Sequence, residues 1–184
     1  PSGTRLRTFM ESLSDGESSS LAGMAVRGTG QRSQGDARPL PSLAMKILTL
    51  ATGADAPLRL HASNPYLVGV EQLPGAITAQ MAEAPRAHLL AWSAVEVGIA
   101  GFSQHGRHLL LPLPVLGAGI GSMRPAKGGG FITLFVRTDH AQMLDVLGSD
   151  TFDQAALDGL LGQRAPLGEL LGCALDVEDW GYDC

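Results

Sequence analysis

The sequence contains few aromatic residues, only two lysines and only two cysteines. Because aromatic residues make up 5% of the chain, the core must be built mainly from Leu, Val, Ile, Met and Ala. Two cysteines, Cys173 and Cys184, are too few for a disulfide framework. We therefore expect a reduced, cytoplasmic protein, with a single Cys173–Cys184 bridge as the alternative.

Long apolar runs and a clustered positive charge are also lacking. No run reaches the ~18 apolar residues of a membrane helix, and the N-terminus lacks the pattern of a secretory signal. The net charge of −5 disfavours nucleic acid as a partner, because nucleic-acid binding needs a clustered basic face. Neither a membrane nor a nucleic acid is therefore expected as a partner.

The charges that are present are distributed unevenly along the chain. The first forty residues carry five arginines and the last nine carry four acidic residues: Arg5, Arg7, Arg27, Arg32 and Arg38, and then Asp176, Glu178, Asp179 and Asp183. Such an asymmetry is typical of interaction tails. The alternative is that these residues are simply the solvated surface of a globular domain.

Residues 1–42 differ in composition from the rest and predict an N-terminal arm or linker. Leu6, Phe9, Met10 and Leu13 recur at helical spacing, so one short helix is expected there. The remainder of the arm is polar and has no period. A segment so poor in apolar residues becomes ordered only when something holds it, which favours docking onto a partner or a second copy. Residues 43–184 are long enough for a single globular domain.

The pattern within this domain predicts an α+β fold, with a mostly antiparallel sheet in the middle of the chain and helices towards the C-terminus. The clearest hairpin joins an alternating strand at 95–99 to an apolar strand at 108–116 through the turn at 104–107. Proline cannot donate to a ladder, so Pro112 and Pro114 indicate that the second strand lies at a sheet edge or is bulged.

Residues 131–136 predict a central strand, because large apolar side chains fall on both of its faces. The spacing of apolar residues and the positions of Gly and Pro predict four helices. These are a helix between Pro74 and Pro85, and helices at 140–147, 153–161 and 166–171.

The glycine-rich segment 117–130 is the strongest local motif. It follows an apolar run, as a dinucleotide-binding loop does, but residues 124–130 are too short to hold the helix that such a fold requires. Two interpretations remain: a hairpin loop that needs glycine for its bends, or a nest of backbone N–H groups that binds an anion. The residues of the second interpretation are Gly117, Gly119, Gly121, Ser122, Arg124 and Lys127.

No catalytic or metal-binding pattern is complete. Ser103 lies in Gly-x-Ser-x-x-Gly, which is not the sequence of a nucleophile elbow. His105 and His108 are three residues apart, but no further ligands are placed near them, so a solvated turn is expected and no metal.

We therefore expect a non-catalytic subunit or protein-binding module of a larger assembly, with no cofactor. Its partner would be another protein or a second copy, and it would dock through the N-terminal arm and an edge strand. The alternative is an enzyme or sensor that binds a phosphorylated or otherwise anionic small molecule at the loop 117–130.

Overall fold

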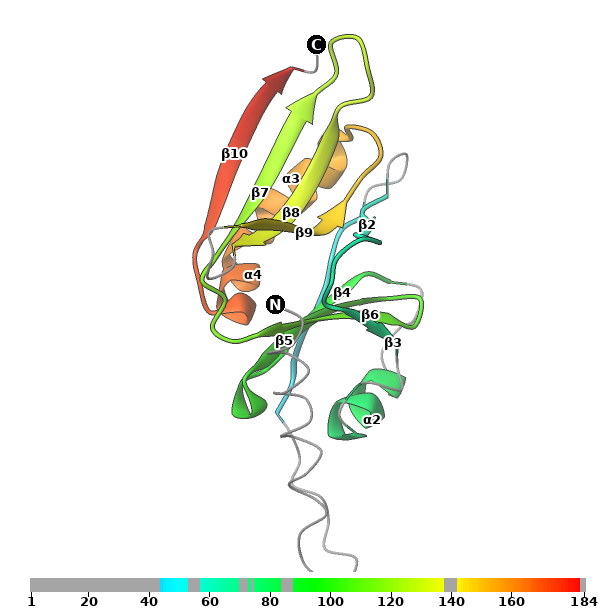
Figure 1. Cartoon of the computed structure of the whole chain (residues 1–184), viewed down its shortest axis with the longest axis vertical. Coiled ribbons are helices and arrows are strands. Elements are labelled where there is room, and N and C mark those ends of the chain that lie inside the picture. Colours follow the sequence, from blue (N-terminus) through cyan, green and yellow to red (C-terminus); the bar gives the residue numbers. More distant parts are fainter. Residues whose placement is uncertain are drawn as a thin grey trace, which may run out of the picture.

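The computed structural model describes residues 44–52, 57–69, 73, 75–83, 88–137 and 142–182, so the arm expected at 1–42 lies outside the described residues. The described chain forms two five-stranded sheets with a few helices (Figure 1). The coarse expectation of a sheet-rich fold that also contains helices is confirmed. All described strand pairs are antiparallel except the pair of β10 with β7.

The first sheet, sheet A, has the strand order β1-β4-β5-β6-β3. Its strands are β1 (Lys46–Thr49), β4 (Leu90–Ala94), β5 (Ile99–Gln104), β6 (Arg107–Pro112) and β3 (Leu67–Gly69). The helix α2 (Gly75–Glu83) packs on one of its faces, as expected for the segment between Pro74 and Pro85. Ile77 and Met81 of this helix join Trp92 and Leu110 of the sheet in a small apolar cluster.

The second sheet, sheet B, has the order β10-β7-β8-β9-β2. Its strands are β10 (Leu175–Tyr182), β7 (Gly117–Arg124), β8 (Phe131–Arg137), β9 (Met143–Gly148) and β2 (Arg59–Leu60). The main core lies between one face of this sheet, the remaining face of sheet A, and the helices α3 (Gln154–Gly162) and α4 (Arg164–Leu171). Phe102, Ile120, Leu134 and Leu160 are fully buried in it.

The helices α3 and α4 confirm the two last helices expected from the sequence. Asp153 caps α3, since its side chain accepts hydrogen bonds from the backbone N–H groups of Ala155 and Ala156 at 2.8 and 3.3 Å. Gly172 ends α4 in a left-handed conformation, which glycine adopts without a steric penalty. None of the described helices is long and apolar enough to cross a membrane.

The strand β8 confirms the central strand expected at 131–136, because it pairs with β7 on one side and β9 on the other. The expected helix at 140–147 is wrong. Residues 138–141 lie outside the described part, and Met143–Gly148 form β9. A short apolar run is compatible with either a helix or a strand. Here Met143–Gly148 pair with the side of β8 that β7 leaves free, so they form a strand.

The predicted hairpin is correct in its turn but not in its first strand. Val95–Val97 form a 3-10 turn, η2, and the strand that reaches the turn is β5. The proline-bearing strand β6 is not a sheet edge, since it lies between β5 and β3. The short β3 pairs only as far as Leu109, so Pro112 stands where no partner needs its N–H.

Candidate functional site

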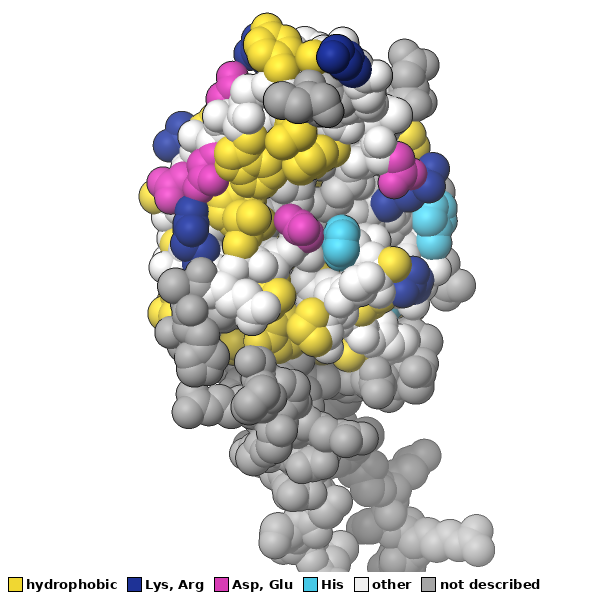
Figure 2. All heavy atoms as spheres, turned by 45° about the horizontal axis from the view of Figure 1, so that its top comes forward, with side chains coloured by type: hydrophobic (Ala, Val, Ile, Leu, Met, Phe, Trp, Pro, Cys, Tyr) yellow, Lys and Arg dark blue, Asp and Glu magenta, His cyan; other side chains and the backbone are white. Residues whose placement is uncertain are grey.

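The outer face of sheet B is the candidate site, because it carries large side chains that no described helix covers (Figure 1). Side chains alternate along each strand, and paired residues share a face. The register therefore places on this face, away from the main core, the residues Gly117, Gly119, Gly121, Met123, Phe131, Thr133, Phe135, Arg137, Met143, Asp145, Asp176 and Glu178, together with Trp180. Figure 2 shows several groups of apolar side chains, the largest of them in the upper middle of the view.

Two glycines of β7 make room for aromatic rings on this face. A Cβ atom added to Gly119 would collide with the ring of Phe135, and one added to Gly121 would collide with the indole of Trp180. Neither glycine has a positive φ, so backbone conformation does not require glycine here. The rings require it, because any side chain would occupy their space. The two rings consequently lie close against the strand.

The aromatic cluster consists of Phe131, Phe135 and Trp180. The ring centroid of Trp180 lies 5.7 Å from that of Phe131, with the ring planes tilted by 53°. It lies 6.2 Å from the centroid of Phe135, and these two rings are stacked. Phe135 is fully buried beneath its neighbours, whereas Phe131 and Trp180 remain partly exposed. The cluster therefore offers apolar ring surface to a binding partner.

Glu178 fixes the orientation of this cluster through both of its carboxylate oxygens. The indole Nε1 of Trp180 donates a hydrogen bond to Oε2 at 3.0 Å. The guanidinium of Arg137 donates to Oε1 at 2.5 Å, and its Cζ atom lies 5.2 Å from the ring centroid of Phe135. A charged pair that also contacts two rings holds them more rigidly than packing alone.

The remaining charges of this face are mainly acidic. Asp145 accepts a hydrogen bond from the hydroxyl of Thr133 at 2.8 Å, and Asp176 is exposed near the start of β10. With Glu178, three carboxylates stand against two guanidinium groups at the outward-facing positions, those of Arg137 and of Arg59, whose register partner Gly148 lies opposite Thr133. The surface therefore combines aromatic rings with negative charge, and such a surface attracts cationic and apolar groups and repels phosphate.

The expectation of a loop over 117–130 is wrong for residues 117–124, which form the interior strand β7. Because β7 pairs with β8 on one side and β10 on the other, Gly117, Gly119 and Gly121 do not form an open backbone nest. The loop between the strands comprises only 125–130. Anion binding remains a prediction, and the positive charges available for it are those of Arg124 and Lys127.

The structure separates the other expected site residues. Ser122 faces the core and is buried, so it does not share the glycines' face. Arg124 ends β7 and lies 3.6 Å from the carboxylate of Asp179. Lys127 is exposed in the loop. Of the expected site residues, the structure brings together only the three glycines on the outer face of sheet B.

The acidic C-terminal segment is not a tail, because residues 175–182 form β10 along the edge of sheet B. For this reason the sequence pattern did not indicate Trp180 as a candidate site residue. A signal was present: glycine at every second position over 117–121 places all three on one face of a strand, which makes room for rings from neighbouring strands.

A second polar group lies inside sheet A, beneath α2. The indole Nε1 of Trp92 donates to the hydroxyl of Ser103 at 2.8 Å, and that hydroxyl lies 2.7 Å from Nδ1 of His108. Ser103 and His108 are 4% and 5% exposed, so the expectation of a solvated turn is wrong for His108, although it holds for His105. This burial favours a structural role, because a substrate would have no direct access to the hydroxyl.

Among the described residues, no group of three His, Cys, Asp or Glu side chains could hold a metal ion. Cys173 is a free thiol, and Cys184 lies outside the described part. Burial, and secondarily the negative charge of Asp176, raises the pKa of the Cys173 thiol. This thiol is therefore less reactive than an ordinary exposed cysteine.

Comparison of the chain with models of known protein families, with curated proteins and with solved structures found no match.

Proposed function

We propose that this chain is a non-catalytic subunit or protein-binding module of a larger assembly, which docks through its N-terminal arm and through the edge of sheet B. The observation that carries the proposal is the aromatic cluster on the outer face of sheet B. Trp and Phe side chains that remain partly exposed on a rigid surface are the groups that anchor protein interfaces.

The charge of this face supports a protein partner. The carboxylates of Asp145, Asp176 and Glu178 oppose the approach of a nucleic-acid backbone. The same carboxylates, which share a face with Trp180, favour arginine or lysine side chains that also contribute apolar contacts. The expected partner is therefore a polypeptide segment with both basic and apolar residues.

The strand β10 supports docking at the neighbouring edge. It is eight residues long, and one of its sides is unpaired among the described strands. Asp176, Glu178 and Asp179 along it disfavour indiscriminate pairing with other chains, since charged residues are a usual protection of exposed edges. A partner with basic residues would be attracted by these carboxylates, whereas a neutral or acidic partner would not.

The arm is tested by removing residues 1–40 and measuring the mass of the full and shortened chains by light scattering. The buried residues of both apolar clusters lie between Leu50 and Leu175, so the deletion removes none of the described core. We expect the shortened chain to lose assembly mass or partner binding. Equal mass and equal partner binding of the two chains would show that the arm is not an assembly element.

A further inference from the structure

The geometry points to a specific occupant of the outer face of sheet B, namely residues 6–13 in the arm of a second copy of this chain. The inference rests on the proposed function and identifies the partner segment. Each copy would then contribute one arm and receive one arm.

The apolar pattern of the arm matches the aromatic cluster. Leu6, Phe9, Met10 and Leu13 follow the spacing i, i+3, i+4, i+7, so in a helix they form one stripe. One turn of a helix rises about 5.4 Å. Of the three rings only Phe131 and Trp180 remain partly exposed, and their centroids are 5.7 Å apart, so two successive turns of the stripe would meet these two rings.

The charges of the two parts are complementary. Residues 1–42 carry five arginines and four acidic residues, whereas residues 43–184 carry eight basic and fourteen acidic residues. Arg5 and Arg7 flank the start of the apolar stripe. On the receiving face, both oxygens of Glu178 already accept from Arg137 and Trp180, so the exposed Asp176 on the same strand is the carboxylate that an arginine of the arm would meet.

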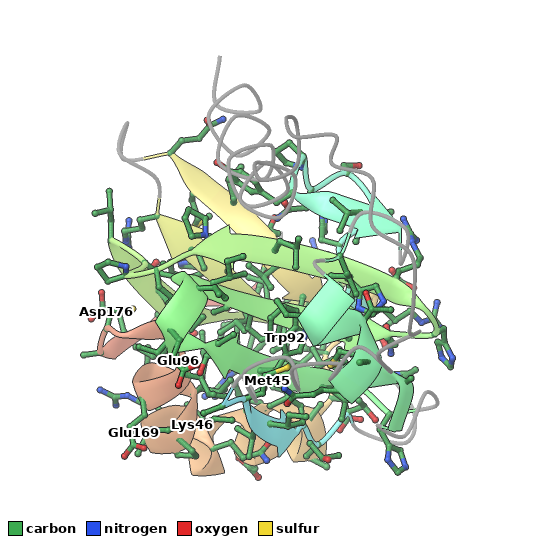
Figure 3. The ribbon with its side chains drawn as sticks, turned by 90° about the horizontal axis from the view of Figure 1, so that it is seen from below. Met45, Lys46, Trp92, Glu96, Glu169 and Asp176 are labelled. Carbon is green, nitrogen blue, oxygen red and sulfur yellow. The ribbon has the colours of Figure 1, made fainter. Side chains whose placement is uncertain are left out.

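The length of the arm allows it to reach the outer face of sheet B on a second copy. The described chain begins at the edge strand β1 of sheet A, where Figure 3 shows Lys46 near the acidic side chains Glu96 and Glu169. Phe131 and Trp180 lie towards the opposite end of the molecule, at the far ends of β8 and β10 (Figure 1). The thirty residues 14–43, at about 3.3 Å each, extend to roughly 100 Å and readily bridge two copies.

The test uses two variants of the full chain whose defects complement each other. The arm variant is Phe9→Asp with Met10→Asp, and the face variant is Trp180→Asp. Each should weaken self-association by about thirty-fold or more, the effect of losing an anchor residue. Because the arm variant keeps an intact face and the face variant keeps an intact arm, a mixture should form a mixed complex that neither forms alone.

Two matched controls accompany these variants. Leu21→Asp with Met24→Asp alters apolar arm residues outside the stripe, and Val95→Glu alters an exposed apolar residue of the turn η2. Both should associate as the unaltered chain does. If Trp180→Asp does not fold, judged by its thermal transition, Phe131→Glu replaces it, since this ring is partly exposed and lies 5.7 Å from that of Trp180.

The outcomes separate this inference from the proposed function. If the arm variant loses self-association and no face variant does, the arm docks at another surface. That result overturns the inference and leaves the proposed function standing. An unaltered full chain that stays monomeric at all concentrations also overturns the inference, because no second copy is then bound. If removal of residues 1–40 changes neither mass nor partner binding, both fall together.

Discussion

The indole ring of Trp180 lies over Gly121, in the space where any other residue would place its Cβ atom. The two residues belong to the parallel pair of β10 and β7, and Glu178 holds the indole N–H from within the same strand. A glycine that would be unfavourable in an ordinary central strand is therefore required here by its neighbour.

Replacing Gly121 with alanine should lower the free energy of unfolding by about 1–3 kcal/mol, the usual effect of overpacking a well-packed site. The added methyl group must displace the Trp180 ring, so the fluorescence of Trp180 should also change. Denaturant unfolding measures the first effect. Gly162→Ala is the control, because an added Cβ there meets no atom within 4 Å. Equal stability of the two variants would contradict the close contact.

The ion pair between Arg137 and Glu178 should contribute about 0.5–1 kcal/mol, since both side chains are partly exposed at 40% and 30%. A double-mutant cycle with Arg137→Met and Glu178→Gln measures this coupling. It should shrink in 1 M salt, where screening acts over about 3 Å. A coupling near zero at low salt would mean that the pair does not hold the ring cluster.

Ser103→Ala should destabilise the protein by about 1–3 kcal/mol, because Trp92 and His108 each lose a buried hydrogen-bond partner. Thermal or denaturant unfolding reports the change. Ser63→Ala serves as the control for an exposed serine. If the two serine variants were equally stable, the buried group would have no role in holding the hairpin of β5 and β6.

Phe135→Ala should reduce stability by about 3–5 kcal/mol, the range found for emptying a fully buried aromatic site. Removal of this ring also leaves Trp180 without its stacked neighbour. The melting temperature is the measurement. A soluble variant with an unchanged melting temperature would show that the Phe135 ring does not pack tightly against Gly119 and Trp180.

Anion binding is tested by a thermal-shift screen with nucleotides and sugar phosphates. A ligand at a hundred times its Kd would add about 2.7 kcal/mol of stability. We expect no shift, because β7 is paired on both sides and Arg124 is already close to Asp179. A shift that Arg124→Ala and Lys127→Ala abolish would establish an anion site and support the alternative function.

Local patterns predicted the elements whose signals lie within a few residues. The central strand β8 is apolar and β-branched, and the helices α3 and α4 end at glycines. The turn at His105 and Gly106 has positive φ at both positions, as a tight hairpin requires. None of these features depends on a distant partner, so the sequence pattern was sufficient.

The candidate site was only partly predictable. The glycines of 117–121 were recognised as unusual but interpreted as a loop, because glycine has a low strand propensity. Trp180 stands among the acidic residues that were interpreted as an interaction tail or a solvated surface, since charged residues indicate solvent exposure when no partner strand is known. In both cases the residues form a strand only because strands distant in sequence supply their hydrogen-bond partners.

By itself, then, the sequence determined the turn, the central apolar strand and the C-terminal helices of this protein. Tertiary structure alone decided that 117–124 and 175–182 are strands, and that Trp180 meets Phe131 from forty-nine positions away. The physical reason is that helices and tight turns are stabilised by contacts between near neighbours in the chain. A sheet ladder instead takes its hydrogen bonds from strands that are distant in sequence, so its partners appear only when the whole chain is folded.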